Sequence, residues 1–382
     1  MPYFDHNATT PLSPVARETW LRACDEHWHN PSSLYRDAAK ARIRLDGARE
    51  QLAEFLGIDA ARVVFTSGAT EAAHAILHYL ARRFPTDPVL LNPTEHPAML
   101  AAAERSFTGR VRTLDVTPDG VIRPEALQSA LALGRPAAVV VMAANNETGV
   151  LQPWADLQAS CREAGVPLVC DASQWFGKLA ASGLGKVDAV IGSAHKFGGP
   201  KGVGFLTLPA DADGFTAQPG GGQENGHRGG TENLPGIWAM VAALATAEQK
   251  QVFLESERLF HRQAFEQALL ARLPGGRVVA SAAERLWNTV AWLAPAGENH
   301  RWVTKLDKLG FQVSTGSACA SGKEGPSHVL GAMGYSAAEA KRVLRFSANW
   351  DTTPETWAAL LDALASVAPA FENTATGVVT VP

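Results

Sequence analysis

The sequence predicts an α/β protein built on a mainly parallel sheet, and three observations support that prediction. Short apolar runs of strand length recur between residues 63 and 208, and segments with helical patterning separate several of them. The runs are apolar throughout rather than alternating, which is typical of strands covered by helices on both faces of a sheet. The chain has 382 residues, enough for roughly two or three domains.

The first 62 residues are expected to be mostly helical. Helices are predicted over residues 14–26 and 35–56, and the second places apolar side chains on one face. Ahead of them, the run Asn7-Ala8-Thr9-Thr10-Pro11 has the composition of a loop. On local grounds alone this run is an entry turn.

The central part of the chain alternates strands with helices. The predicted strands are residues 63–66, 89–91, 111–116, 137–142, 167–170, 187–191 and 203–208. The predicted helices between them are residues 71–84, 97–107, 124–133 and 153–164. Beyond about residue 250 the composition changes to a charged helix and then a mixed pattern. We therefore expect a large domain over residues 12–250 and a smaller α/β domain made from residues 1–11 and 251–382.

Charge and cysteine content narrow the classes of partner. Lys and Arg number 34 against 38 Asp and Glu, and this net charge of −4 argues against a dedicated nucleic-acid or anionic-membrane binder. The four cysteines, Cys24, Cys161, Cys170 and Cys319, have no metal-ligand spacing, which suits free thiols in a reducing compartment. No apolar run reaches membrane-spanning length and no signal segment is evident. A cytoplasmic protein that uses small molecules and protein partners, without a metal, is expected.

The stretch from residue 192 to residue 204 is the first candidate for chemistry. It reads Gly-Ser-Ala-His-Lys-Phe-Gly-Gly-Pro-Lys-Gly-Val-Gly and joins two predicted strands, where polar groups can meet a ligand. A single lysine in such a loop is most often only solvated. However, Asp171 ends another buried strand, and a lysine amine, a carboxylate and nearby hydroxyl or imidazole donors are what an aldehyde cofactor such as pyridoxal 5′-phosphate requires. Lys196 is the candidate anchor.

Other motifs lie where loops meet strands or helices. The turn Ser67-Gly68-Ala69-Thr70-Glu71 would direct free N–H groups at a ligand, although many such turns are only helix caps. His96 precedes a helix that begins with proline, which also suits an ordinary surface histidine. Cys319 lies among Gly, Ser and Ala in an accessible loop, whereas Cys24, Cys161 and Cys170 are expected to be buried.

These motifs, together with Tyr-Phe-Asp-His-Asn-Ala-Thr-Thr at residues 3–10 and Arg-Phe-Ser at residues 345–347, resemble the cysteine desulfurases of the NifS/IscS type. That group belongs to the class V aminotransferase-like enzymes of pyridoxal-phosphate fold type I. The resemblance spans nearly the whole chain. It implies a large domain with a mainly parallel sheet, a smaller α/β domain, and a homodimer.

The resemblance also implies a role for each matching residue. In the reaction, Lys196 binds the cofactor aldehyde, His96 stacks on the ring and moves protons, and Cys319 takes sulfur from the substrate. The remaining cofactor contacts are implied for Ala69, Thr70, Asn146, Asp171, Gln174, Ser193, His195 and Thr231. Asp171 faces the ring nitrogen, and Thr231 reaches the phosphate of the other subunit. Arg345, with Asn146, binds the substrate carboxylate.

The activity so implied converts L-cysteine to L-alanine, with sulfur passing to a persulfide on Cys319 and then to an acceptor protein. An iron–sulfur scaffold or a tRNA-thiolation protein would serve as acceptor. Two departures from the family pattern, Ala73-His74 and Gly198, leave local contacts open. Selenocysteine cleavage, another β-elimination or transamination remain alternatives, as does a cofactor-free homologue, although the intact Lys196, Asp171, His96 and Cys319 argue against the last.

Overall fold

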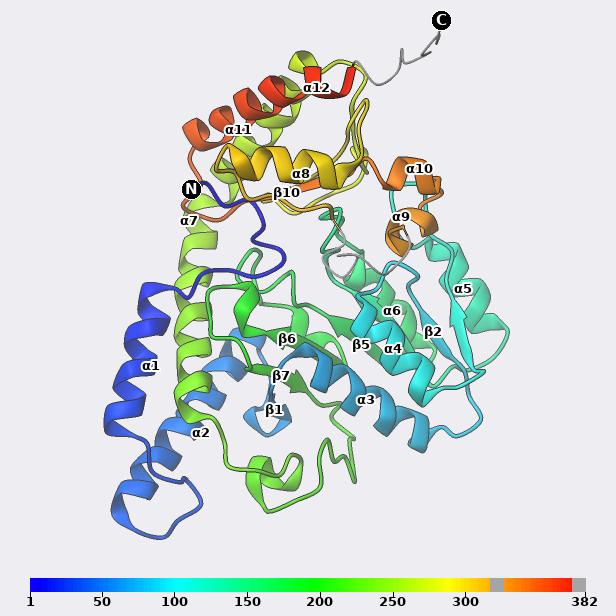
Figure 1. Ribbon diagram of the computed structural model, residues 1–382. Helices are drawn as coiled ribbons and strands as arrows, with labels where there is room; N and C mark the ends of the chain where they lie inside the picture. The colour runs from blue at the N-terminus through cyan, green and yellow to red at the C-terminus, as the bar shows by residue number, and fades with distance from the viewer. Residues whose placement is uncertain (317–325, 373–382) are drawn as a thin grey trace, which may run out of the picture.

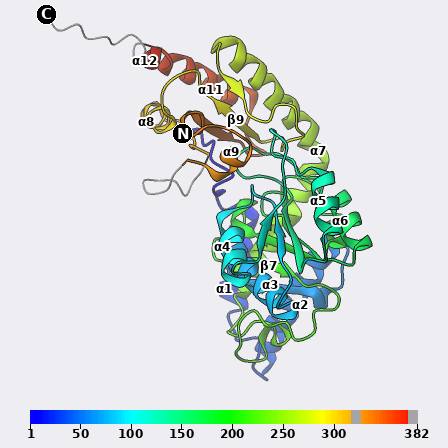
Figure 2. The ribbon, with the colours of Figure 1, turned by 90° about the vertical axis from the view of Figure 1, so that its right-hand side faces the viewer.

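Two β-sheets, one large and one small, form the framework of the protein (Figure 1). The computed structural model describes residues 1–316 and 326–372. The long helix α7 (Leu234–Arg272) runs from the region of the large sheet to that of the small sheet. Seen from the side, the small sheet and its helices sit above the large one (Figure 2). The α/β fold predicted from the sequence is confirmed.

The large sheet has seven strands in the order β1-β7-β6-β5-β4-β2-β3. Its strands are β1 (Val63–Thr66), β2 (Val89–Leu91), β3 (Val111–Thr113), β4 (Ala138–Met142), β5 (Leu168–Asp171), β6 (Ala189–Ser193) and β7 (Gly204–Thr207). The pairs from β6 through β5, β4 and β2 to β3 are parallel, whereas β7 runs antiparallel to both of its neighbours. The sheet is thus mainly parallel with one antiparallel strand inserted near an edge.

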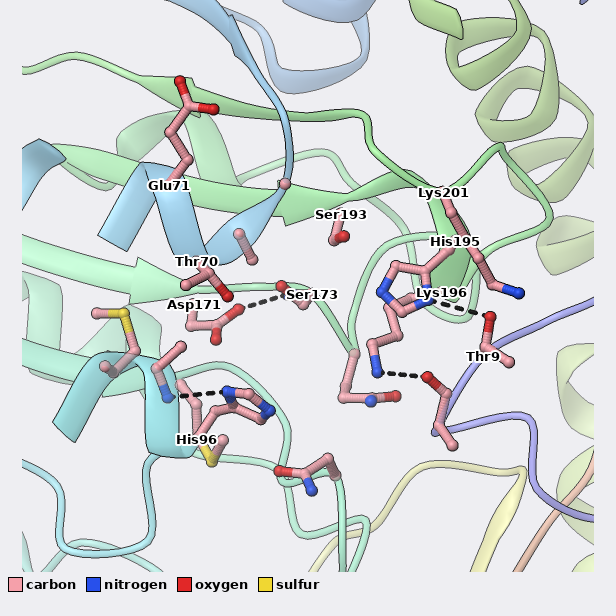
Figure 3. A pocket seen from close by; sticks show the side chains of 18 of the residues that line it. Thr9, Thr70, Glu71, His96, Asp171, Ser173, Ser193, His195, Lys196 and Lys201 are labelled. Carbon is pink, nitrogen blue, oxygen red and sulfur yellow. Dashed lines mark hydrogen bonds between the residues drawn. The ribbon is translucent and has the colours of Figure 1, made fainter. Parts of the chain in front are cut away.

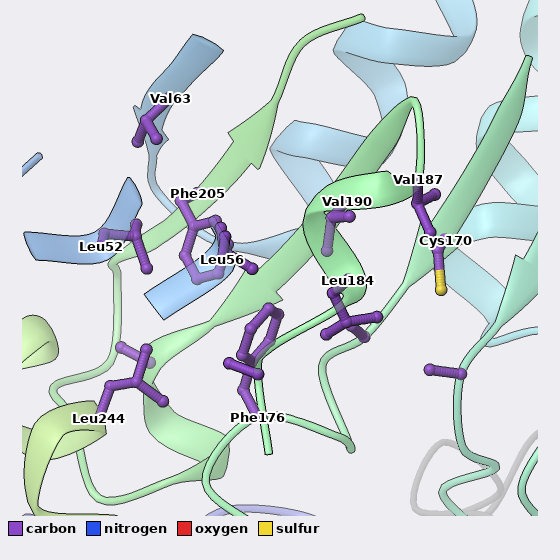
Figure 4. Close-up of a cluster of buried hydrophobic side chains, with 14 of the residues drawn as sticks. Leu52, Leu56, Val63, Cys170, Phe176, Leu184, Val187, Val190, Phe205 and Leu244 are labelled. Atoms are coloured by element: carbon purple, nitrogen blue, oxygen red, sulfur yellow. The ribbon is translucent and has the colours of Figure 1, made fainter. Parts of the chain in front are cut away.

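Helices cover both faces of this sheet, which explains why its strands are apolar throughout. Along β4, Val139 and Val141 pack into one hydrophobic cluster while Val140 packs into another on the opposite face. The helices around the sheet are α1 (Pro14–Glu26), α2 (Arg36–Leu56), α3 (Ala69–Arg83), α4 (Pro97–Ser106), α5 (Pro124–Ala132) and α6 (Trp154–Glu163). Figure 4 shows the first cluster, in which Phe176 and Phe205 lie between strands and helices.

The small sheet has the strand order β10-β9-β8 and a separate hydrophobic cluster around Trp292 and Trp302. Its strands are β8 (Arg277–Val278), β9 (Thr289–Leu293) and β10 (Val343–Ser347). The accompanying helices are α8 (Asn299–Lys308), α9 (His328–Ala332), α10 (Ala337–Ala340), α11 (Pro354–Val367) and α12 (Pro369–Glu372). We propose that the two sheets correspond to the two predicted domains; residue 250, the expected boundary, falls inside α7.

The N-terminal segment, residues 3–10, lies between the two sheets and contacts both. Asp5 forms a β-bridge with Ser347 of β10, and the backbone N–H of Asn7 donates to the Ser347 hydroxyl at 3.0 Å. In the other direction, the Thr10 N–H donates to the His195 carbonyl at 2.8 Å. The predicted entry turn is therefore a link between the sheets.

Most element bounds differ from the predicted ones by only one or two residues. The larger exception is the third strand, which ends at Thr113 rather than at residue 116; α3 begins at Ala69, two residues before the predicted start at residue 71. The α3 difference places Ala69 and Thr70 in the first helical turn. One burial prediction was wrong, because Cys24 is exposed; it lies on the outer face of α1, while Cys161 and Cys170 are buried as expected.

Candidate active site

A cavity of about 510 Å³ opens where the parallel strands β4, β5 and β6 end and where α3 and α4 begin. Figure 3 shows Thr70, His96, Asp171, Ser193 and Lys196 arranged around it. This edge of a parallel sheet is where α/β proteins bind ligands. The predicted cofactor residues that line the cavity are Ala69, Thr70, His96, Asn146, Asp171, Gln174, Ser193, His195 and Lys196.

The first turn of α3 forms one wall of the cavity. Its N-cap, Gly68, has a φ of 149°, and Gly204 of β7 packs directly against it. A Cβ atom at Gly204 would lie 2.6 Å from the Gly68 Cα, so only glycine lets the turn approach the sheet this closely. The backbone N–H groups at the start of a helix lack intrahelical acceptors and carry partial positive charge. With the Ser193 hydroxyl, they make this wall suitable for an anion.

Lys196 lies in a short 3-10 turn that directly follows β6. Its Nζ donates to the Asn7 carbonyl at 2.8 Å and to the Ala8 carbonyl at 2.9 Å. The N-terminal segment thus holds the amine at the cavity wall. Lys201, the other lysine of the same motif, also lines the cavity, but unlike Lys196 it is exposed to solvent.

Asp171 is the last residue of β5, and only 7% of its surface is exposed. Its Oδ1 accepts a hydrogen bond from the Ser173 N–H at 2.9 Å, which fixes the carboxylate at the cavity wall. Among the residues that the structure describes, the buried Ser173 hydroxyl has no hydrogen-bond partner. Buried polar groups normally have one, so this hydroxyl is available to a ligand. Ser173 was not predicted, although it lies between two residues that were.

His96 is the N-cap of α4 and is held in a defined tautomer. Its Nδ1 accepts a hydrogen bond from the Ala98 N–H at 3.1 Å, so the proton of the neutral ring is on Nε2. Burial lowers the pKa of His96, the nearby Asp171 carboxylate opposes this, and the Lys196 charge lowers it further. The ring is therefore neutral near pH 7, with Nε2–H available as a hydrogen-bond donor.

His195 faces the same cavity with a hydrogen bond of 3.1 Å between its Nδ1 and the Thr9 hydroxyl. Burial, together with the charges of Lys196 and Lys201, lowers the pKa of His195 to about 4. The imidazole is consequently a neutral hydrogen-bonding group at physiological pH. Thr9 comes from the N-terminal segment and was not predicted to contact the site.

Glu95 lies directly behind the site and is completely buried. One of its carboxylate oxygens accepts a hydrogen bond from the Met142 N–H at the end of β4. Burial raises the pKa of Glu95 well above its usual value, and the charge of Asp171 raises it further. The buried environment therefore favours the protonated, neutral form of Glu95. No sequence pattern indicated this, because the burial of Glu95 depends on how β4 and α4 pack.

Among the residues that the structure describes, two predicted ones are not in the cavity lining. Arg345 on β10 is 1% exposed, and its guanidinium donates to the Asn146 and Gly316 carbonyls at 2.8 Å each and forms an ion pair with Asp5. Thr231 is exposed on the loop before α7 and lines a separate small cavity. Cys319 lies outside the described residues.

Across residues 1–316 and 326–372, no cluster of three or more His, Cys, Asp or Glu side chains has an arrangement that could hold a metal ion. Within the same ranges, no helix combines the length and the apolar character needed to cross a bilayer.

Comparison with known proteins places this geometry in a family. Residues 2–359 match the model of the aminotransferase class-V family. The chain is 39% identical over 380 residues to a cysteine desulfurase of Cereibacter sphaeroides, covering 96% of this chain and 94% of the relative.

Solved structures agree. A NifS-like protein has a TM-score of 0.88 and 28% identity, with 97% of this chain and 100% of that chain covered. A structure described as SspA in complex with cysteine has a TM-score of 0.76 and 28% identity, with coverages of 91% and 98%. The chain belongs to the aminotransferase class-V family, and its relatives in that family are cysteine desulfurases.

Proposed function

We propose that this protein is a pyridoxal-phosphate-dependent cysteine desulfurase. The main supporting observation is that one cavity gathers a lysine amine, a carboxylate, a neutral imidazole and the N-terminal turn of a helix. The names of the relatives and the cysteine bound in the SspA structure support L-cysteine as the substrate.

The described residues fit this cofactor group by group. Its phosphate matches the first turn of α3 at Ala69 and Thr70, with Ser193 and His195 as further donors. The unpartnered Ser173 hydroxyl, buried at the cavity wall, is an additional donor for a ligand with several oxygens. A cavity of about 510 Å³ is within the usual range for small-molecule sites.

The remaining cofactor contacts involve charge. Asp171 would pair with the protonated ring nitrogen, the Lys196 amine would bind the aldehyde, and the side chains of Asn146 and Gln174 lie where donors to the phenolic oxygen are expected. When bound, the cofactor supplies an electron-accepting ring that stabilises negative charge at the substrate Cα. The protein must then supply the proton transfers.

Lys196 and His96 are the groups placed to move those protons. The Lys196 Nζ is held at the cavity wall by two carbonyls and can take the proton from the substrate Cα. His96 is neutral with its proton on Nε2, so it presents an N–H donor to the substrate; it can pass a proton from that atom once the ring has taken one up as imidazolium. The tautomer follows from the helix-cap hydrogen bond.

The sulfur-transfer step is assigned to Cys319. Its thiolate attacks the substrate sulfur, so an S–S bond forms and the Cβ–S bond of the substrate breaks. The carbon skeleton keeps the electron pair of the broken bond, takes up a proton and leaves as L-alanine, while Cys319 becomes a persulfide. Arg345, with Asn146, is proposed to bind the substrate carboxylate, and this requires Arg345 to exchange its contact with Asp5.

The assembly and the cellular context complete the proposal. Thr231 is exposed and off the cavity of its own chain, which supports a homodimer in which it serves the other subunit. The sulfur acceptor would be a protein such as an iron–sulfur scaffold or a tRNA-thiolation protein. Free thiols at Cys24, Cys161 and Cys170 support a cytoplasmic location.

The test is to reconstitute the protein with pyridoxal phosphate, add L-cysteine and a thiol reductant such as dithiothreitol, which releases the persulfide sulfur as sulfide, and measure sulfide and alanine together. Both should form in equal amounts in the parent, whereas Cys319→Ser should bind the cofactor and release almost no sulfide, because a hydroxyl is a poor nucleophile toward sulfur. The matched control is Cys24→Ser, an exposed cysteine on α1, which should keep full turnover.

Two results would contradict the proposal. Desulfuration by Cys319→Ser at the parental rate would favour a β-eliminating or selenocysteine-cleaving enzyme. Borohydride reduction followed by peptide mapping should place the cofactor on Lys196, and a label on Lys201 would refute the anchor.

A further inference from the structure

A second lysine lies behind the active site without lining its cavity. Lys178 lies in the turns that follow β5 and is 4% exposed. Its Nζ donates to the side-chain Oε1 of Gln174 at 2.9 Å and to the backbone carbonyl of the same residue at 3.2 Å. The described contacts of this amine are thus concentrated on Gln174, one of the residues that line the cavity.

From Gln174 the hydrogen bonds continue to the reactive amine. The Gln174 Nε2 donates to the Asn7 carbonyl at 2.8 Å, and the Lys196 Nζ donates to the same carbonyl oxygen at 2.8 Å. Lys178, Gln174, Asn7 and Lys196 therefore form a continuous chain of contacts. It begins outside the cavity and ends at its wall.

The chemistry of an amine fixes the orientation of the Gln174 amide. A charged lysine has three N–H donors and no acceptor, and even a neutral amine has two N–H groups for the two Gln174 oxygens. The amide oxygen must therefore face Lys178, and the amide NH₂ must face Asn7. The two ends of a glutamine amide have nearly the same shape, so their hydrogen-bond partners decide the orientation; the Asn7 carbonyl selects the NH₂ end and Lys178 selects the oxygen end.

The backbone around Lys178 is also held firmly. Gly177 has a φ of 71°, and a Cβ there would lie 2.3 Å from the Phe197 Cβ, so no other residue fits. The indole N–H of Trp350 donates to the Gly177 carbonyl at 2.9 Å, and that of Trp287 donates to the Lys178 carbonyl at 2.9 Å. The Lys178 side chain therefore starts from a fixed position.

Burying this amine costs stability. Burial, together with the charges of Lys196 and Arg345, lowers the pKa of Lys178 to about 7. Because the unfolded lysine keeps a pKa near its ordinary value, the buried amine destabilises the folded protein at neutral and acidic pH. A methionine of similar length would fill the space without this cost. Stability alone does not explain a lysine here.

We propose that Lys178 is a positioning residue that acts through Gln174, holding its amide NH₂ toward Asn7 and toward the phenolic oxygen of the cofactor. This inference rests on the proposed pyridoxal-phosphate function. Lys178, which lies outside the cavity, would thus set the orientation of the Gln174 amide inside it.

A double-mutant cycle on cofactor binding tests the inference. The variants are Lys178→Met, Gln174→Ala and the double variant, and the measurement is the Kd for pyridoxal phosphate, obtained by titrating the cofactor-free protein. Each single change should weaken binding by roughly 3- to 10-fold, the worth of one hydrogen bond. The double variant should bind as Gln174→Ala does, because Lys178 has no other route to the cofactor.

Two further measurements separate positioning from packing. Lys178→Arg retains donors and charge and should recover part of the affinity, whereas the exposed Lys186→Met should match the parent. The Tm of cofactor-free Lys178→Met should equal or exceed that of the parent.

Parental affinity in Lys178→Met, or additive losses in the double variant, would refute the inference. A lower Tm or failure of Lys178→Met to fold would show a structural role instead. If the parent itself binds no pyridoxal phosphate, the proposed function fails rather than the role of Lys178.

Discussion

Two buried arginines, Arg49 on α2 and Arg345 on β10, differ in how far their carboxylate partners are exposed to solvent. Arg49 of α2 forms a two-pronged ion pair with Glu224, with both contacts at 2.8 Å and exposed side-chain fractions of 7% and 2%. Arg345 of β10 pairs with Asp5, whose side chain is 24% exposed, and otherwise contacts backbone carbonyls and the Ser314 hydroxyl. The first pair is closed to solvent. The second can exchange a partner at modest cost, as a substrate-binding arginine must.

The largest effect should follow from breaking the closed pair. Arg49→Met leaves Glu224 buried without its cation, and we expect the free energy of unfolding to fall by about 3–5 kcal/mol. Urea unfolding of the cofactor-free protein measures this change. The control is Arg42→Met on the same helix, whose pair with Asp46 is 39% and 44% exposed; its loss should be about 0.3–0.5 kcal/mol. Equal losses at both sites would remove the distinction between closed and open pairs.

The next effect should appear in catalysis rather than in stability. Arg345→Lys keeps the charge but loses the planar fork that grips a carboxylate, so the KM for L-cysteine should rise about tenfold or more. The control is Arg342→Lys, which also loses contacts to carbonyls, those of Ala294 and Pro295, but has no proposed role in substrate binding. An unchanged KM in Arg345→Lys would assign Arg345 a structural role like that of Arg49.

The region between the sheets should also make stability depend on pH. Burial and the charge of Lys178 together lower the pKa of His6 to about 4, although the Asp351 carboxylate opposes the shift. The unfolded histidine binds its proton near pH 6.5, so the unfolded state binds more protons between pH 6.5 and 4. The stabilisation is therefore full above pH 6.5 and is lost as the pH falls to 4.

His6→Asn should lose less stability over that interval than the parent, by about 2–3 kcal/mol. Urea unfolding at pH 7 and at pH 4.5 measures the difference. His300→Asn, at an exposed position on α8, should follow the parental pH dependence. A parental slope in His6→Asn would mean that this histidine is not buried in the neutral form.

The smallest effect should come from removing the charge of Asp5, the ion-pair partner that Arg345 is proposed to exchange. Asp5→Asn removes the carboxylate that competes for Arg345, and the KM for L-cysteine should fall by roughly 2- to 10-fold, corresponding to at most about 1.4 kcal/mol. Steady-state kinetics check this. A higher KM would show that Asp5 positions Arg345 instead of competing with the substrate.

The sequence predicted those site residues that directly follow strands or begin helices. Asp171, Lys196 and His96 lie in this class, because the end of a parallel strand determines which edge of the sheet its next residues reach. By contrast, the burial of Lys178 and Glu95 results from contacts between distant segments. No local pattern indicated either one.

Local sequence patterns also failed to predict the exposure of one cysteine and the length of one helix. Cys24 was expected to be buried because most free cysteines are, yet α1 turns it to solvent. Helix α7 continues through residue 250 although the composition changes there, because its first half packs on the large sheet and its second half on the small one. Such contacts depend on packing rather than on sequence pattern.

The N-terminal segment between the sheets also constrains the order in which the protein can assemble. The Asn7 carbonyl accepts a hydrogen bond from the Lys196 amine, and the Asn7 backbone N–H donates one to the hydroxyl of Ser347, 340 residues later in the chain. During synthesis, the ribosome must therefore make almost the whole protein before this contact can form. Contacts between such distant residues form slowly, because a long loop must close first. The large sheet can consequently assemble early, while the cavity is completed only after β10 has emerged.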